Sequence, residues 1–259
     1  MTSVDAGSGH PAPPSDDALP LTGERTVPGI ARENYWFRRH EAAYRHLAPW
    51  CNGAVVLEAG CGEGYGAALL AHSARQVLAL DYDADTARHV ARRYPQLAAV
   101  RANLAAVPVR TSTVDVVANL QVIEHLWDPP GFLAECARVL RPGGLLLVTT
   151  PNRLTFSPGR ETPLNPFHTE EFAPSELDAL LRAAGFAVRH MTGLHHGCLL
   201  RGLDEKHGGS LVDTQLAQHG DSWPPELLGD VAGVRAGDFT VASGDLDRSL
   251  DLIAVATTR

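Results

Sequence analysis

The sequence of 259 residues predicts a doubly wound α/β fold, in which a mostly parallel sheet carries helices on both faces. Short apolar runs rich in Val, Leu and Ala alternate with amphipathic segments of helical length. A glycine-rich turn directly follows the first of these runs, where open sheets of this type bind ligands. The connections between the strands are expected to be right-handed.

Seven apolar runs have the length and the residue types of buried strands. Asp128 is placed to cap a helix whose first turn contains Pro129 and Pro130, and Gly143 and Gly144 follow the end of that helix. The predicted strands are residues 54–57, 76–80, 98–101, 114–120, 145–150, 186–191 and 250–257, and the predicted helices are residues 33–47, 67–72, 84–93, 128–140 and 175–184.

Composition divides the chain into three parts. Residues 1–20 are rich in Pro, Gly, Ser and Asp and are predicted to form a disordered tail. Residues 21–50 are predicted to form an N-terminal helical cap, and residues 51–259 the main domain. Within this domain, residues 195–245 are rich in Gly, His and Asp and are interpreted as an insertion or lid.

Charge and cysteine content argue against several classes of partner and site. A formal net charge of −8 disfavours nucleic acid and anionic membranes. No apolar run approaches the roughly 20 residues that span a bilayer, and the N-terminus has no signal-peptide pattern. The four cysteines lack the Cys-x-x-Cys spacing of zinc or redox sites. A cytoplasmic protein with reduced thiols is expected, and its oligomeric state is left open.

The glycine turn, residues 58–66, reads Glu-Ala-Gly-Cys-Gly-Glu-Gly-Tyr-Gly. Glycines permit positive φ angles and let a ligand lie on the backbone, and the helix that follows favours a bound anionic group. The spacing Gly62-x-Gly64-x-x-Ala67 satisfies a relaxed dinucleotide fingerprint, so the turn alone leaves nicotinamide and other nucleoside cofactors open. Asp81 ends the second strand, where a carboxylate can accept hydrogen bonds from ribose hydroxyls; capping a helix is its alternative role.

Four motifs together resemble those of the class I S-adenosylmethionine-dependent methyltransferases. The run Glu58-x-Gly60-x-Gly62-x-Gly64 resembles the first motif of that family. The other three are residues 77–82 for the second motif, residues 114–126 for the fourth strand and residues 141–144 for the turn before the fifth strand. The resemblance implies a Rossmann-like sheet of seven strands whose last strand is antiparallel. A dehydrogenase, the minor alternative, does not explain the later motifs.

The resemblance implies S-adenosyl-L-methionine as the cofactor and assigns residues to its parts. The first motif surrounds the methionine portion, Asp81 binds the ribose and Tyr82 lies beside the adenine. Residues 35–40 resemble an aromatic segment with an Arg that folds over the cofactor, so Arg39 is a candidate for the methionine carboxylate, with core packing as the alternative. Asn103 stands where many members have Asp. The implied cofactor-binding residues are Arg39, Glu58, Gly60, Cys61, Gly62, Asp81, Tyr82, Asn103, Leu104 and Gln121.

Methyl transfer to an alcohol needs a group that takes the hydroxyl proton, and histidine suits this near neutral pH. His125 follows the fourth strand, and Glu124 beside it can orient a ring or bind substrate. His168 is the second candidate, in a loop beyond the fifth strand that resembles a segment of glycan-associated methyltransferases. The alternative roles are local capping for Glu124 and His125 and a helix-entry turn for His168.

No metal site is predicted. His195 and His196 are adjacent on an extended segment, so their side chains point to opposite faces and do not readily chelate one ion. A structural or pocket role is favoured for both. A weak Mg²⁺ site that involves Asp204, Glu205 and Asp213 is left open.

Residues 21–25, 35–40, 152–172 and 207–210 resemble a group of actinobacterial methyltransferases. Its members are associated with polymethylated polysaccharides, such as the methylglucose lipopolysaccharides of mycobacteria. This resemblance implies O-methylation of a sugar hydroxyl, in particular the 6-hydroxyl of glucose in a polysaccharide precursor. A phenol or amine acceptor in small-molecule biosynthesis is one alternative, and a protein that binds a nucleoside cofactor without catalysis is another.

Overall fold

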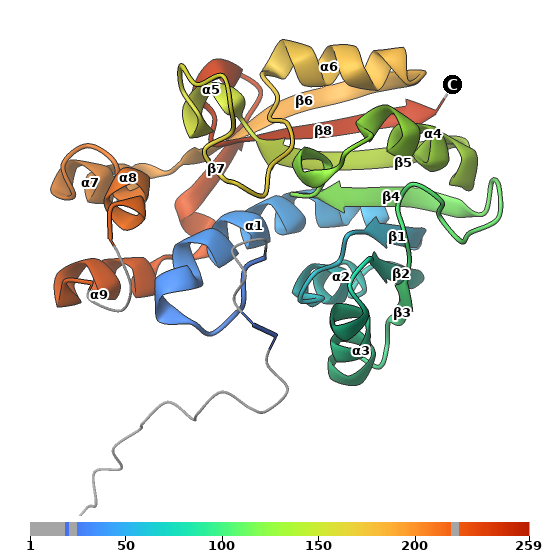
Figure 1. Cartoon of the computed structure of the whole chain (residues 1–259), viewed down its shortest axis with the longest axis horizontal. Helices are drawn as coiled ribbons and strands as arrows, with labels where there is room; N and C mark the ends of the chain where they lie inside the picture. The colour runs from blue at the N-terminus through green and yellow to red at the C-terminus, as the bar shows by residue number, and fades with distance from the viewer. Residues whose placement is uncertain (1–18, 21–24, 219–222, 259) are drawn as a thin grey trace, which may run out of the picture.

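The computed structural model describes residues 19–20, 25–218 and 223–258, so most of the predicted tail lies outside the described residues. An eight-stranded sheet forms the centre of the molecule, with the strand order β3-β2-β1-β4-β5-β8-β6-β7 (Figure 1). The strands are β1 (Val55–Ala59), β2 (Gln76–Asp81), β3 (Ala98–Arg101), β4 (Val114–Leu120), β5 (Leu140–Pro151), β6 (Phe186–His196), β7 (Phe239–Ala242) and β8 (Asp251–Thr258).

The directions of the strands confirm the predicted doubly wound sheet. Strands β3, β2, β1, β4 and β5 are parallel, and β8 runs antiparallel between β5 and β6. The sheet has one edge strand more than the seven predicted strands: β7, which pairs antiparallel with the end of β6. Strand β6 continues to His196 instead of ending at Met191, and this extension gives β7 its partner. Residues 239–242 lie inside the stretch rich in Gly, His and Asp, so the sequence alone includes them in the insertion instead of the sheet.

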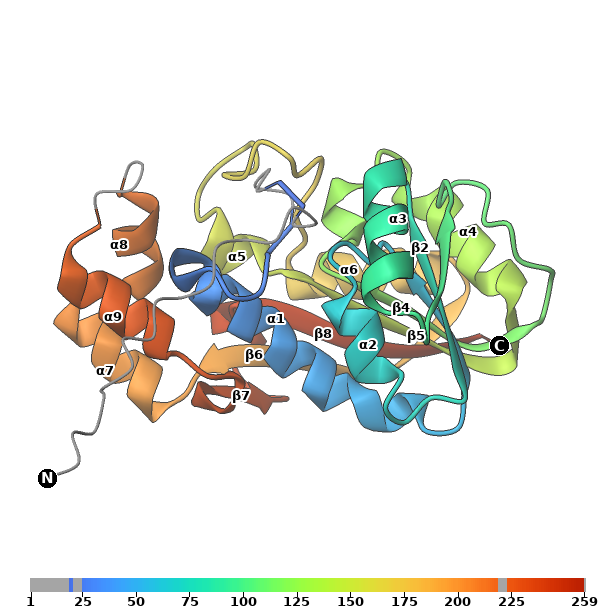
Figure 2. The same cartoon turned by 90° about the horizontal axis from the view of Figure 1, so that it is seen from below.

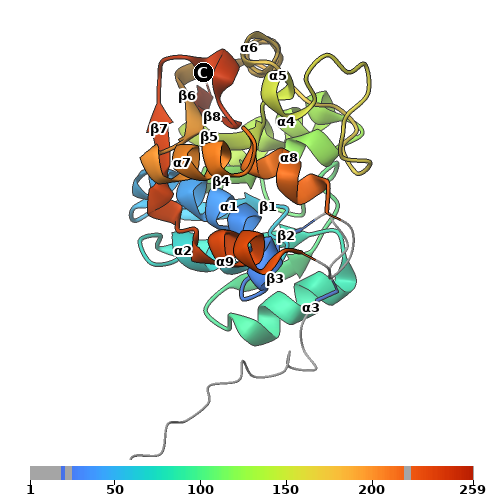
Figure 3. The same cartoon turned by 90° about the vertical axis from the view of Figure 1, so that its left-hand side faces the viewer.

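Helices cover both faces of the sheet, with α4 and α6 on one side and α1, α2 and α3 on the other (Figures 1 and 3). The side chains of successive strand residues point to opposite faces of the sheet. Val56 therefore packs in the core under α1 and α2, whereas Leu57 packs in the core under α4. The α-helices are α1 (Asn34–Leu47), α2 (Tyr65–Leu70), α3 (Ala84–Arg93), α4 (Pro129–Val139), α5 (Arg153–Phe156), α6 (Pro174–Ala183), α7 (Cys198–Lys206), α8 (Leu211–Leu216) and α9 (Pro225–Gly233). No helix in the described part of the chain is long and apolar enough to cross a bilayer.

The predicted insertion, residues 195–245, contains α7, α8, α9 and β7 and lies at the end of the sheet where the parallel strands finish (Figure 1). Leu200, Leu211 and Leu227 from these helices are buried in the same core as Tyr35 of α1. Helix α9 also packs against residues 31–33, just before α1. The described part of the insertion therefore supports α1 from the side.

Helix α1 is fixed to the sheet by a buried ion pair. The Arg39 guanidinium donates to both carboxylate oxygens of Asp251, at 2.8 and 2.7 Å, and to the backbone oxygen of Leu250 at 2.7 Å. The side chains of Arg39 and Asp251 are only 3% and 1% exposed. Because Asp251 begins β8, this pair holds the middle of α1 near the carboxyl ends of the parallel strands, while the helix runs along one face of the sheet (Figure 2). Trp36 and Phe156 stack against the guanidinium.

Replacing Arg39 with Met should lower the free energy of unfolding by about 3–5 kcal/mol, because Asp251 is then left buried without its counterion. Urea titration measures this loss. Replacing both partners, with Asp251→Leu added, should recover much of the stability. The matched control is Arg45→Met, since Arg45 pairs with Glu41 at a side chain that is 62% exposed; it should change stability by about 1 kcal/mol or less. Equal losses in the two single variants would contradict the anchoring role.

Candidate active site

A cavity of about 800 Å³ lies at the carboxyl ends of β1, β2 and β4. Its wall combines the glycine turn with segments that follow each of these strands. Arg25 and Thr26 contribute from the N-terminal segment, and His40 and Tyr44 contribute from α1. Other lining residues used below are Gly60, Cys61, Gly62, Tyr65, Asp81, Tyr82, Asn103, Leu104, Gln121, His125, Leu126, Trp127, Asp128 and Phe132.

The glycine turn adopts backbone conformations that favour glycine. Gly60 and Gly62 have φ angles of +88° and +49°. A Cβ atom on Gly60 would stand 2.7 Å from both methyl groups of Val122, whereas a Cβ on Gly62 would meet nothing within 4 Å. The amides of Gly60 and Cys61 both donate to the carbonyl of Leu80, which fixes the turn against the end of β2. The turn therefore exposes its backbone to the cavity.

Asp81 is held in place by two backbone amides. Gly62 donates to one carboxylate oxygen at 2.9 Å, and Asp83 donates to the other at 3.0 Å. Each oxygen keeps capacity for a further hydrogen bond, which is what the two hydroxyls of a ribose require. Tyr82 follows at the rim with 68% of its surface exposed. The structure thus brings together the predicted glycine turn, Asp81 and Tyr82.

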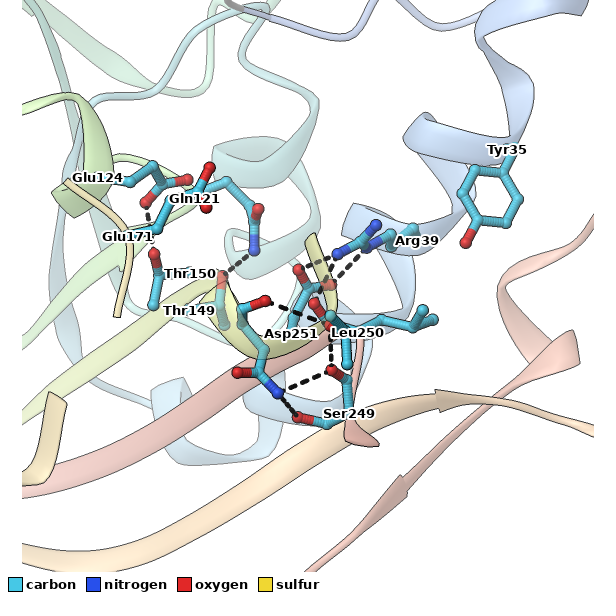
Figure 4. A network of polar contacts seen from close by, with 12 residues as sticks. Tyr35, Arg39, Gln121, Glu124, Thr149, Thr150, Glu171, Ser249, Leu250 and Asp251 are labelled. Atoms are coloured by element: carbon cyan, nitrogen blue, oxygen red, sulfur yellow. Dashed lines mark hydrogen bonds and ion pairs between the residues drawn. The ribbon is translucent and has the colours of Figure 1, made fainter. Parts of the chain in front are cut away.

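The predicted residues on the other wall also reach the cavity. Asn103 and Leu104 line it, and the side-chain oxygen of Asn103 accepts from the amide of Ala105 at 2.9 Å. Gln121 lines it too and has a φ angle of +59°, and its amide nitrogen donates to Thr149 at 3.2 Å (Figure 4). A left-handed backbone is uncommon for a residue other than glycine and often marks a functional turn.

Comparison with known proteins agrees with this geometry. Residues 57–148 match the family model described as a methyltransferase domain. A probable S-adenosylmethionine-dependent methyltransferase of Mycolicibacterium smegmatis is 56% identical over 253 residues, which cover 96% of this chain and 98% of that protein. One from Mycobacterium tuberculosis is 58% identical, over 93% of this chain and 90% of that protein. The chain belongs to the S-adenosylmethionine-dependent methyltransferases.

Solved structures confirm the fold of this methyltransferase. An S-adenosylmethionine-dependent methyltransferase from Thermotoga maritima superposes with a TM-score of 0.59 at 18% identity, over 86% of this chain and 93% of that chain. The [4+2]-cyclase SpnF superposes with a TM-score of 0.56 at 21% identity, over 85% of this chain and 80% of that one. Because a cyclase shares the fold, the fold alone does not determine the reaction.

The residues present fit S-adenosyl-L-methionine, the cofactor of this family. The glycine turn offers exposed backbone to the methionine portion, Asp81 offers an anchored carboxylate to the ribose, and Asn103 and Leu104 offer a wall to the adenine. When bound, the cofactor supplies an activated methyl group on a sulfonium. The protein's own contribution is to bind it, orient it and place an acceptor in line with the methyl group.

Glu58 takes a different position from the one predicted. It is fully buried behind the cavity wall, where the hydroxyl of Tyr44 donates to its carboxylate at 2.5 Å. Its other carboxylate oxygen has no partner among the described residues. Burial raises the pKa of Glu58 to about 8. Tyr44 also occupies the space over Gly66, where a Cβ would stand 2.1 Å from its ring. Tyr44 lines the cavity and Glu58 does not, so Glu58 contacts the cavity wall only through Tyr44.

The prediction that Arg39 binds the methionine carboxylate is wrong, because its guanidinium is used by Asp251 and Leu250. The next residue, His40, lines the cavity instead, and burial lowers its pKa to about 4, so it is neutral. Arg25 is the one Arg or Lys among the described residues that line the cavity. Its guanidinium also donates to the Thr86 hydroxyl. Arg25 is therefore the cation available to a carboxylate.

The three predicted catalytic residues meet at one side of the cavity. His125 lines the cavity, and its Nδ1 lies 3.0 Å from the backbone oxygen of Phe167. His168 stands behind it, with ring centroids 4.8 Å apart and planes at 83°. Glu124 is 1% exposed, and Thr150 donates to its carboxylate at 2.9 Å (Figure 4). Burial, together with nearby Asp251 and Glu171, raises the pKa of Glu124 to about 8 against the lowering effect of its hydrogen bonds, including that from Thr150.

Glu124, His125 and His168 are also the one group of three among the described residues with metal-ligand spacing, since their ligand atoms lie within 4.8 Å of one another. Both ring nitrogens of His168 already bond to Glu171 and Asn165. The carboxylates left open for Mg²⁺ do not form such a group. Asp204 instead accepts from His196 at 2.6 Å, and His196 in turn lies 2.7 Å from the Tyr35 hydroxyl, which ties α7 to α1. His195 and His196 do not line the cavity.

Sequence reasoning missed several residues that shape the site: Arg25, Tyr44, Tyr65, Asn165 and Glu171. Tyr65 lies in the glycine turn, and Arg25, Asn165 and Glu171 lie in segments that carry the resemblance, but no local pattern assigns any of them a role in the site. The run from His168 to Glu171 has the spacing of one helical turn, and the structure shows the two side chains 2.7 Å apart. Tyr65 begins α2, and its hydroxyl lies 2.9 Å from Thr26 and 3.2 Å from His40.

The variants Arg25→Gln and Asp81→Asn should show which part of the cofactor each residue binds. Arg25→Gln should weaken binding of S-adenosylhomocysteine by about tenfold, since a charged hydrogen bond to the carboxylate is lost, and should leave binding of 5′-methylthioadenosine unchanged. Asp81→Asn should weaken both ligands by about tenfold, because both contain ribose. Calorimetric titration measures these affinities, with Asp85→Asn on the exposed side of α3 as the control. If Arg25→Gln weakened the binding of both ligands equally, Arg25 would not be the residue that binds the methionine carboxylate.

The free protein should lose stability as the pH rises from about 4.5 to about 8, in part because of Glu58. Its folded pKa of about 8 lies above the ordinary value of 4.5, so the folded state holds a proton that the unfolded state releases. Each such group lowers the free energy of unfolding by up to about 1.4 kcal/mol per pH unit in this interval. Urea titrations at pH 5.5 and 7.5 should show a smaller decline for Glu58→Gln than for the wild type. An equal decline in the free energy of unfolding for Glu58→Gln and the wild type would show that Glu58 does not hold this proton in the folded state.

Proposed function

We propose that this methyltransferase transfers the methyl group to a hydroxyl of a sugar. The observation that carries the proposal is the tautomer of the His125 ring. A backbone carbonyl can only accept a hydrogen bond, so the ring nitrogen that meets Phe167 must carry the proton. The neutral ring then has its lone pair on Nε2, and the ring lines the cavity. A histidine in this tautomer can take a proton from an alcohol.

The reaction is an in-line displacement. The acceptor oxygen forms a bond to the methyl carbon as the bond from sulfur to that carbon breaks, which leaves S-adenosylhomocysteine. The hydroxyl proton moves to Nε2 of His125. A positioned base of this kind contributes typically about 10²–10⁴-fold to the rate, and a neutral alcohol needs it because its own proton is lost late.

The sugar assignment is supported by the rim beside His125. Trp127 is 93% exposed although it lines the cavity, so its indole offers an apolar face next to polar groups. A sugar ring has an apolar face of C–H groups and polar edges, and it suits such a mixture. Asp128 and Gln121 add polar groups to the same wall. The resemblance to methyltransferases of polymethylated polysaccharides favours the 6-hydroxyl of glucose in a polysaccharide precursor.

A phenol is the second candidate acceptor. Ubiquinone biosynthesis O-methyltransferase of Xanthomonas oryzae is 30% identical over 159 residues, which cover 55% of this chain and 66% of that protein. Leu126 and Phe132 give the cavity wall an apolar part that an aromatic ring could contact. This likeness supports transfer to oxygen under either proposal.

The test is a screen of radiolabelled methyl transfer from S-adenosyl-L-methionine to glucans, mannans and short methylated oligosaccharides, with phenols and amines in parallel. We expect label on sugar oxygen, and loss of about 10²-fold or more in kcat for His125→Ala with unchanged affinity for S-adenosylhomocysteine. The control is Glu205→Gln, an exposed residue of α7. Turnover of phenols or amines alone would reject the sugar, and full activity of His125→Ala would reject the base.

A further inference from the structure

We propose that Asn165, His168 and Glu171 form a positioning chain that sets the tautomer and orientation of His125, and that His168 is not itself the base. This inference rests on the proposed function, since it concerns the same proton transfer. It chooses between the two histidines that sequence alone leaves as equal candidates. The chain lies in the segment between β5 and α6.

The hydrogen bonds of Asn165 define its orientation. Its side-chain oxygen accepts from the Phe167 amide at 3.0 Å, so its amide nitrogen faces His168 Nε2 at 3.1 Å. An amide nitrogen only donates, so His168 Nε2 must accept and carries no proton. His168 Nδ1 therefore holds the proton and donates to Glu171 at 2.7 Å. Both ring nitrogens of His168 are engaged.

Burial reinforces this assignment. The side chains of His168 and Glu171 are 4% and 0% exposed, and Phe156 covers the His168 ring at a centroid distance of 5.5 Å. Protonation of His168 Nε2 would set two donors against each other, because the Asn165 amide faces that nitrogen. With both ring nitrogens engaged, His168 offers no lone pair to the proton of an acceptor. His125 lines the cavity, whereas His168 does not.

The same chain fixes the carbonyl that His125 uses. Phe167 is held between its neighbours, because its amide donates to Asn165 and the amide of His168 donates to the Asn165 backbone oxygen at 3.1 Å. The Phe167 carbonyl is then aimed at His125 Nδ1. In Ser-His-Asp enzymes a buried carboxylate has this orienting role. Here a backbone carbonyl has it, and its position depends on the side chains around it.

A second contact joins this segment to the turn that carries His125. Thr169 donates from its amide to the Glu124 backbone oxygen at 2.7 Å, and its hydroxyl lies 2.6 Å from the Leu126 oxygen. The backbone on both sides of His125 is therefore tied to the residue that follows His168. A ring held at its backbone and at Nδ1 can present Nε2 in only one direction. This arrangement supplies the fixed geometry that proton transfer requires.

The test is a double-mutant cycle on kcat with His125→Asn, His168→Asn and the double variant. We expect a loss of about 10²-fold for His125→Asn, a smaller loss for His168→Asn, and no further loss in the double variant, because His168 acts only through His125. The ionisation that governs the pH profile should persist in His168→Asn and vanish in His125→Asn. Affinity for S-adenosylhomocysteine should stay within about twofold throughout, which separates positioning from misfolding.

Two further variants distinguish geometry from charge. Glu171→Gln keeps an oxygen that can accept from His168 Nδ1 and should retain most of the activity, whereas Glu171→Leu should resemble His168→Asn. Glu170→Gln, an exposed change on the same segment, is the control and should behave as wild type.

Three outcomes would overturn the positioning chain. Full activity of His168→Asn beside an inactive His125→Asn would refute it while leaving the proposed function intact. A further large loss in the double variant would make His168 an independent catalytic residue. Loss of activity with a chelator and recovery with Mg²⁺ or Mn²⁺ would assign the two rings to a metal. Full activity of His125→Asn would refute the proposed base itself.

Discussion

The buried ion pair between Arg39 and Asp251 decides where α1 lies, and much of the site depends on that position. Two charges removed from water are tolerated only as a close, hydrogen-bonded pair, so the helix can dock only where the guanidinium meets the first residue of β8. In this position His40 and Tyr44, which are one helical turn apart, both face the cavity. Tyr44 then reaches Glu58 at 2.5 Å.

The cofactor end of the cavity is built mainly from backbone, and the packing around it explains why. Gly60 cannot carry a side chain because Val122 stands against it, and Gly66 cannot because Tyr44 does. Val122 belongs to the segment that leads to His125, and Tyr44 belongs to α1. The glycine turn therefore contacts both the segment that leads to His125 and helix α1. A change at either glycine would disturb more than one wall.

The sequence predicts well what is local and predicts poorly what depends on distant partners. Helix α3 has the predicted bounds, because Asp83 caps it by accepting from Thr86 at 2.7 Å and its apolar spacing is regular. The aromatic segment around Arg39 predicts a role for its side chain at the cofactor. Its real partner, Asp251, is far away in the chain, and no local pattern indicates the pairing. Likewise β7 exists because β6 extends beyond its predicted end.

The polar group that contacts the His125 ring suits the direction in which charge moves during the proposed reaction. Methyl transfer removes one positive charge from the sulfonium, and proton transfer places one on the His125 ring. The Phe167 carbonyl that accepts from His125 Nδ1 is a neutral dipole, and a hydrogen bond to it strengthens when the ring becomes an imidazolium. Glu171 accepts from His168 and so holds the segment that carries this carbonyl. The carboxylate that fixes the segment between β5 and α6 therefore acts through the Phe167 carbonyl, which stabilises the charge that His125 gains as the methyl group leaves sulfur.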